Sequence, residues 1–175
     1  MKRTLCALLA LICLACPAWA EVTLESVSPT PSAAPAGVAF SGDGISLTLP
    51  SGLEPLSQEA LEGYAAAVKH DFPGAAQISL AAADEARGAF VALLRTESEL
   101  SATEAAREAA ERILGGSESV AEVQYGENAC AALACAIEAR TYTLYFLSDG
   151  AQLLVLAVSG LEEKEVSGIL TGLQF

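Results

Sequence analysis

Two long apolar runs lie near the C-terminal end of the chain, on either side of a short polar turn. The runs span residues 136–147 and 151–158, and Ser148-Asp149-Gly150 separates them. An Asp-Gly pair between two such runs favours a type I′ turn, in which both central residues have positive φ. We therefore predict a hairpin of two strands. Because residues 153–158 are apolar on both faces, the second strand should be covered on two sides and lie near the middle of a sheet.

Alternation and helical spacing predict the remaining elements. Strand patterns occupy residues 45–49, 78–83, 89–95 and 120–125, and helical spacing occupies residues 56–72, 101–114 and 159–173. The runs 78–83 and 89–95 flank a polar turn and should form a second hairpin. Ser101 with Glu104, and Ser159 with Glu162, have the spacing of capping boxes at the starts of helices.

The predicted element order is strand, helix, strand, strand, helix, strand, strand, strand, helix. Strands outnumber helices, and the predicted hairpins require antiparallel neighbours. We expect an α+β fold in which a mostly antiparallel sheet carries helices on both faces, as an α/β/α sandwich.

The N-terminus has the features of a secretory signal peptide. Lys2 and Arg3 precede an apolar run over residues 5–16, and Ala18 and Ala20 are small residues at the positions that signal peptidase recognises. We expect residues 1–20 to be removed and the protein to be periplasmic or secreted. A lipoprotein, acylated at Cys16 after cleavage, is the alternative.

The mature chain should contain a tether followed by one domain. Residues 21–44 include three prolines among Ser, Thr and Ala, which is typical of a flexible Pro/Ser/Ala-rich linker. Residues 45–175 should form the single folded domain. No later apolar run has the length of a membrane-spanning helix, so we predict no membrane span.

Two cysteines remain once the signal peptide is removed, Cys130 and Cys135. In an oxidising compartment this pair predicts a disulfide across the mouth of a turn. The spacing differs from the Cys-x-x-Cys of redox-active sites. A zinc site would need further ligands, and His70 is the only histidine.

The chain is strongly acidic, with a formal net charge of −13. Removal of the signal peptide takes away Lys2 and Arg3 and makes the mature part more acidic still. Such a surface repels nucleic acid and anionic lipid, so we expect neither as a partner. It attracts a basic protein or a cationic ligand, although acidity also serves solubility alone.

The element order, the segment ISLTLP at residues 45–50, the hairpin YFLSDGAQLLVLAV and the terminal helix ending in LQF together resemble the PsbP-like superfamily. That group includes PsbP, the Ran-binding import factor family and DcrB-type envelope proteins. The resemblance covers about residues 45–175 and implies an antiparallel sheet between helices. It also implies a binding or accessory role, and it assigns no functional residue.

A search for catalytic groups identifies few candidates. His70 precedes Asp71 near the end of a predicted helix, where an imidazolium complements the helix dipole. The sequence contains no G-x-S-x-G, P-loop or H-E-x-x-H motif. Carboxylates are frequent, in the pairs Asp84-Glu85 and Glu97 with Glu99 and in the run 162–165, but we interpret them as solvated surface residues.

Three residues of the main hairpin are candidates for a ligand-binding cleft or surface: Arg140, Tyr142 and Tyr145. Tyrosines on strands more often belong to the core. We therefore expect an exported, non-enzymatic binding or accessory protein of the bacterial cell envelope, without a cofactor, whose partner is an unknown protein or small ligand. The alternatives are a small carboxylate- or metal-dependent hydrolase and the lipid-anchored form described above.

Overall fold

The computed structural model describes residues 37–57, 59, 61–62, 77–116, 120–137 and 140–175. These residues form an α+β fold with mostly antiparallel sheets and two helices. The strands are β1 (Val38–Gly42), β2 (Ile45–Leu49), β3 (Glu54–Pro55), β4 (Gln77–Asp84), β5 (Ala89–Glu97), β6 (Val120–Tyr125), β7 (Asn128–Ile137), β8 (Arg140–Ser148) and β9 (Gln152–Ser159). The helices are α3 (Ala102–Leu114) and α4 (Glu163–Gly172).

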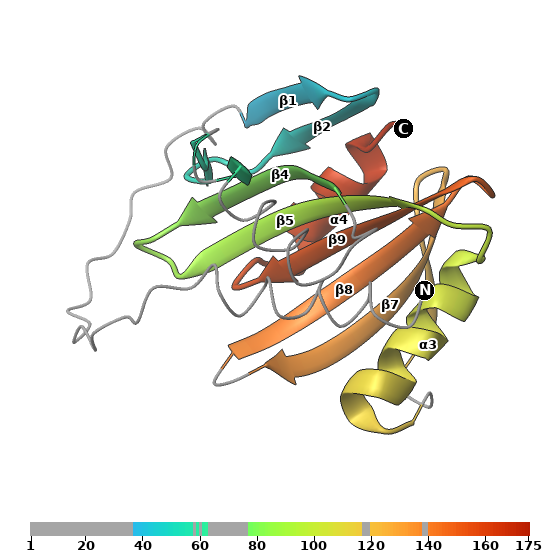
Figure 1. Cartoon of the computed structure of the whole chain (residues 1–175). Coiled ribbons are helices and arrows are strands. Elements are labelled where there is room, and N and C mark those ends of the chain that lie inside the picture. The colour runs from blue at the N-terminus through green and yellow to red at the C-terminus, as the bar shows by residue number, and fades with distance from the viewer. Residues whose placement is uncertain (1–36, 58, 60, 63–76, 117–119, 138–139) are drawn as a thin grey trace.

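Seven strands form one sheet in the order β3-β4-β5-β9-β8-β7-β6, and β1 and β2 form a separate two-stranded sheet (Figure 1). Every neighbouring pair in the large sheet is antiparallel. The predicted central hairpin is confirmed, because β8 and β9 pair from Thr143↔Val158 to Ser148↔Leu153 and lie in the interior of the sheet. The predicted hairpin of residues 78–83 and 89–95 is also confirmed as β4 and β5.

Successive residues of β9 enter two different hydrophobic clusters. Leu153, Val155 and Ala157 belong to a cluster that includes alanines of α3, and Leu154, Leu156 and Val158 belong to one that includes β2 and α4. Helix α3 contacts β7 and β8, and α4 contacts β2. Both faces of β9 are therefore buried, as its continuous apolar run predicts.

The turn of the central hairpin differs from the prediction. Asp149 has no positive φ, and only Gly150, with φ of 91°, adopts a left-handed conformation. Instead, Asp149 Oδ1 accepts hydrogen bonds from the N–H groups of Ala151 and Gln152 at 2.9 and 2.7 Å. The type I′ geometry occurs at the other Asp-Gly pair, since Asp43 and Gly44 have φ of 53° and 77° and connect β1 to β2.

The folded part begins before residue 45. Residues 38–42, predicted as tether, form β1 and pair with β2. The reason is that β1 supplies backbone partners and places Phe40 against the cluster that contains β2. The remainder of the predicted tether, the predicted signal peptide, and most of the predicted helix at 56–72, with His70, lie outside the described residues.

The element order after α3 also differs from the prediction, because β7 is an additional strand. The predicted strand at residues 136–147 divides between β7 and β8. Alanine has low strand propensity, so the sequence NACAALACAI does not resemble a strand. In the structure, Ala131 and Leu133 of β7 pack against the alanines of α3, and small side chains allow the close approach of the helix.

The strand β7 places the two cysteines differently from the arrangement on which the disulfide prediction depended. Cys130 and Cys135 both lie in β7, where no turn separates them, and they belong to different hydrophobic clusters. Five residues of extended chain separate their Cα atoms by about 16 Å, whereas a disulfide requires about 7 Å or less. The prediction depended on a loop between the two cysteines, and that loop does not exist in this structure.

The two described helices begin differently. The predicted capping box of α3 is confirmed, since the Ser101 hydroxyl accepts from the Glu104 N–H and the Glu104 carboxylate accepts from the Ser101 N–H. The capping box of α4 instead joins Glu162 and Glu165. The predicted cap Ser159 still belongs to β9 and donates its hydroxyl to the Thr141 carbonyl at 2.9 Å.

Candidate functional site

The three candidate cleft residues do not share a cleft. Arg140 is the first residue of β8 and pairs with Ile137. Tyr142 is 2% exposed and Tyr145 is 9% exposed, and they belong to opposite clusters. Residues three apart in a strand point to opposite faces, so these two tyrosines are core residues and cannot line one pocket.

The buried Tyr145 packs against the partly buried Tyr125 of β6. Their ring centroids lie 5.9 Å apart, with an interplanar angle of 81°. Burial and the hydrogen bond to Tyr125 raise the pKa of the Tyr145 phenol. Burial likewise raises the pKa of the neighbouring Cys130 thiol to about 11. At neutral pH the thiolate fraction of Cys130 is therefore roughly one in ten thousand, which makes it a poor nucleophile.

Two of the candidate carboxylates are bound to one arginine. Arg87 donates from Nε to Asp84 Oδ2 at 2.7 Å and from Nη1 to Glu165 Oε1 at 2.9 Å. The hydrogen bond from Arg87 lowers the pKa of Asp84. Partial burial alone would raise the pKa of Glu165, but hydrogen bonds from the Glu162 backbone and Arg87 lower it overall. A general acid at neutral pH needs a raised pKa, so this pair has the opposite tuning.

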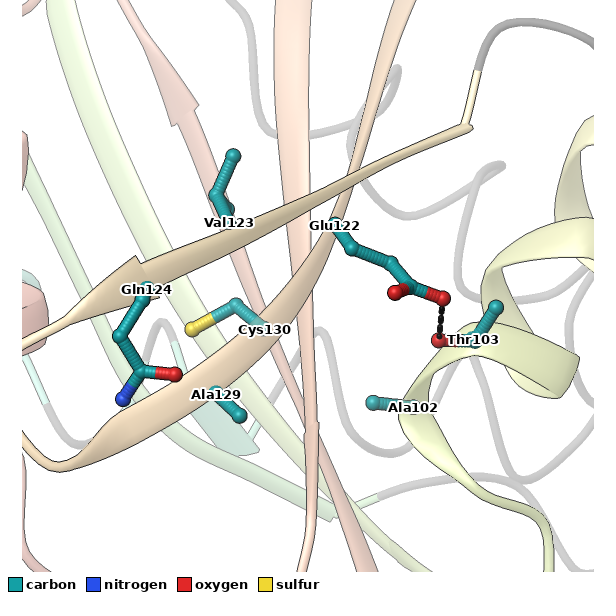
Figure 2. A pocket seen from close by; sticks show the side chains of 7 residues that line it. All are labelled: Ala102, Thr103, Glu122, Val123, Gln124, Ala129 and Cys130. Carbon is teal, nitrogen blue, oxygen red and sulfur yellow. Dashed lines mark hydrogen bonds between the residues drawn. The ribbon is translucent and has the colours of Figure 1, made fainter.

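A pocket of about 320 Å³ lies where the start of α3 meets β6 and β7 (Figure 2). Its lining comprises Ala102, Thr103, Glu122, Val123, Gln124, Ala129 and Cys130. Glu122 points from β6 toward α3, and the Thr103 hydroxyl donates to its Oε1 at 3.1 Å. The carboxylate retains capacity to accept further hydrogen bonds, because an ionised carboxylate has about four acceptor positions.

The strand that carries Glu122 is held at its turn by α4. The Asn128 side-chain amide donates to the carbonyls of Leu170 and Leu173 at 2.7 and 2.9 Å. These carbonyls belong to the end of α4, where a helix leaves acceptors unpaired. Asn128 pairs with Tyr125 across the β6–β7 turn, so this contact positions the end of β6. The turn at the end of β6 is therefore attached to the end of α4.

A second pocket, of about 540 Å³, lies between the end of β5 and the β8–β9 turn. Its lining comprises Glu97, Ser98, Glu99, Gly150, Ala151 and Gln152. Among the described residues, no group of three or more His, Cys, Asp or Glu side chains has an arrangement that could hold a metal ion. No helix in the described part of the chain is long and apolar enough to cross a membrane.

Among the residues that line the first pocket, Cys130 was selected from the sequence, as half of a predicted disulfide, and the other six were not. Glu122 and Gln124 do alternate with Val123 and Tyr125 in a predicted strand, and Thr103 follows a predicted helix cap. That alternation shows that one face of the strand is polar. It does not show that the strand is the edge of the sheet or that α3 lies beside it.

No protein-family model and no curated protein matches the chain. Among solved structures, the chain is similar to a crystal structure from Bacteroides thetaiotaomicron VPI-5482, with a TM-score of 0.51 and 17% sequence identity. The match covers 79% of this chain and 48% of that one, so the chain spans about half the length of its structural relative. At this identity, the similarity shows a shared fold alone.

Proposed function

We propose that the chain is an exported, non-enzymatic binding or accessory domain of the bacterial cell envelope. The arrangement at β6 is the observation that carries this proposal. An exposed edge strand, a carboxylate with spare acceptor capacity and an adjoining pocket lie together, and they are held by α3 on one side and α4 on the other. An edge strand, a carboxylate and a pocket that lie together are features of sites that bind a partner without reacting with it.

The chemistry of the reactive groups supports a role without catalysis. Cys130 and Tyr145 are buried with raised pKa values, and Asp84 and Glu165 are bound to Arg87 with lowered ones. Catalytic groups have pKa values brought toward the working pH, whereas each of these is shifted away from it. We therefore favour binding over the alternative of a carboxylate-dependent hydrolase.

The packing also supports a PsbP-like arrangement. Helices α3 and α4 belong to separate hydrophobic clusters that share the strands of one sheet between them. A sheet with helices on both faces requires two such clusters, one under each helix. The proposed architecture is the α/β/α sandwich of that superfamily, with the β1–β2 hairpin as an addition beside α4.

Site-specific photo-crosslinking in the source bacterium tests the binding role. A photoreactive residue replaces Gln124, and the matched control replaces Lys164, which is exposed in α4 with 83% of its side chain accessible. We expect one discrete crosslinked product from position 124 and none from position 164. Equal crosslinking from both positions, or turnover of a substrate by the purified chain, would overturn the proposal.

Mass spectrometry of the mature N-terminus tests export separately. Cleavage after Ala20 predicts Glu21 as the first residue. A chain that begins at a diacylated Cys16 would replace the soluble form by the lipid-anchored one, and an uncleaved chain would contradict export.

A further inference from the structure

The two ends of the seven-stranded sheet are unequal. At one end, β3 has two residues and includes Pro55. Short edge strands and prolines prevent further pairing, because proline has no N–H to donate. At the other end, β6 has six residues without proline, and no described strand pairs with its outer side. Of the two end strands of this seven-stranded sheet, as far as the structure describes it, β6 presents the longer ladder and is the one suited to accept another strand.

The register shows which backbone groups of β6 point outward. Tyr125 and Asn128 close a two-residue turn, Gly126-Glu127, in which Gly126 has φ of 60°. The residues that close such a turn direct their N–H and C=O groups toward each other, and the direction alternates along the strand. The N–H and C=O groups of Glu122 and Gln124 therefore point away from β7, toward the side on which no described strand pairs with β6.

The side chains beside this edge have different chemistry on its two faces. On the face of α3, Glu122 and Gln124 are exposed and adjoin the 320 Å³ pocket. On the other face, Val123 and Tyr125 are partly buried and pack against the cluster that contains α4. A strand added here would alternate between positions that face a carboxylate and positions that face apolar side chains.

We propose that β6 accepts an extended basic segment of a partner protein as an eighth, antiparallel strand. Lys or Arg side chains of that segment lie against Glu122 and the pocket, and apolar side chains lie against Val123 and Tyr125. This inference rests on the proposed binding function and names the chemistry of its partner. The net charge of −13 attracts a cationic segment over a longer range.

Charge also argues against a second copy of this chain as the occupant. Two-fold pairing of β6 centred on Glu122 would place the two Glu122 side chains directly opposite each other, which is destabilising. Other registers avoid that contact, but each still brings together two chains of charge −13. We therefore assign the edge to a basic partner, and dimerisation is an outcome that the test must detect.

Binding of a labelled peptide to the full mature protein tests this proposal. The probe is an alternating Lys-Val heptapeptide that begins and ends with Lys, with a Glu-Val heptapeptide as the opposite-charge control, measured by fluorescence anisotropy at low salt. We expect the Lys-Val peptide to bind and Glu122→Lys to weaken binding about tenfold or more. The matched variant Glu85→Lys makes the same charge change at the exposed β4–β5 turn and should weaken binding less than about twofold.

Backbone methylation separates strand addition from simple charge attraction. In an antiparallel pairing, the Lys residues opposite Glu122 direct their N–H groups toward β6. A peptide N-methylated at its Lys residues should therefore lose binding, and one methylated at its Val residues should retain it. Equal binding by both methylated peptides, or equal effects of Glu122→Lys and Glu85→Lys, would overturn the proposal.

Three further outcomes are decisive. Dimerisation of the unliganded chain that Glu122→Lys disrupts, measured by sedimentation, would assign the edge to a second copy and contradict the proposal. Absence of peptide binding, together with a discrete crosslink from position 124, would contradict the basic strand but leave the binding function intact. Absence of the discrete crosslink from position 124 would contradict the proposed binding function.

Discussion

Arg87 joins three separate parts of the chain, and its removal provides a quantitative test of the structure. Arg87 binds the carboxylates of Asp84 and Glu165, as described above. In addition, its Nη2 donates a hydrogen bond to the Ser51 carbonyl at 3.3 Å. The two carboxylate side chains are 12% and 13% exposed, while that of Arg87 is 40% exposed. These contacts connect the β4–β5 turn to the start of α4 and to the segment before β3.

We expect Arg87→Met to destabilise the protein by about 2 kcal/mol. A hydrogen bond to a charged group contributes about 1.5–3 kcal/mol when its partners are shielded. Because the guanidinium is substantially exposed, we take about 1 kcal/mol for each carboxylate and little for the longer contact to Ser51. For a domain of this size the loss corresponds to a melting temperature lower by about 6 °C.

The effect should depend on pH in a defined direction. The folded-state pKa values of Asp84 and Glu165 are lowered, so their contribution to stability is present above their unfolded-state pKa values and is lost as pH falls through the folded-state values. The difference between the parent and Arg87→Met should therefore be complete at neutral pH and should shrink below about pH 4.

Urea unfolding, followed by far-UV circular dichroism at neutral and acidic pH, measures the loss of stability and its dependence on pH. The control is Lys164→Met, which removes the same charge from the exposed ion pair with Glu162 and should cost less than about 0.5 kcal/mol. A loss for Arg87→Met no larger than that of the control would refute the reasoning. So would a loss that stays constant down to acidic pH.

Three other predictions address the N-terminus, the thiol and a close backbone approach. Trp19 is the only tryptophan and lies in the predicted signal peptide, so the proposed exported form should show no tryptophan emission, and such emission would mean that residues 1–20 are retained. Cys130 should resist iodoacetamide at pH 8 in the native state and react in urea, because burial raises its pKa to about 11, and rapid native alkylation would contradict this. A Cβ at Gly52 would lie 2.5 Å from Asp84 Oδ2 at a φ of 92°, whereas Gly44, with φ of 77°, has open space around it. Gly52→Ala should therefore lower the free energy of unfolding by about 1 kcal/mol more than Gly44→Ala, and equal losses in urea unfolding would count against the contact.

Local sequence signals predicted the elements that depend on nearby residues. The Ser101 and Glu104 pair acts within one helical turn, and the β4–β5 and β8–β9 hairpins connect neighbours in the chain. The errors arose where a distant contact outweighed local preference. The alanine-rich strand β7 forms because β6 and β8 pair with it and α3 packs on it, which strand propensity does not describe.

In the candidate site, too, local sequence signals and contacts between distant residues gave different answers. Tyr142 and Tyr145 were selected because aromatic side chains often bind ligands, but the sheet buries them on opposite faces. Thr103 and Glu122 were not selected, because they are 19 residues apart and only the packing of α3 beside β6 brings them together. Neither the polar face of β6 nor the start of α3 identifies a site by itself.

The sequence by itself determined the alternation of apolar and polar positions, the start of α3 and the strong negative charge of the chain, since each depends on a residue and its near neighbours. Only the tertiary structure decided the order of strands in the sheet, the separation of the two cysteines and the position of β6 at the edge of the sheet that the described residues form. The physical reason is that pairing between strands is a choice among several backbone partners of similar chemistry. The packing of the two helices against the whole sheet determines which strands pair.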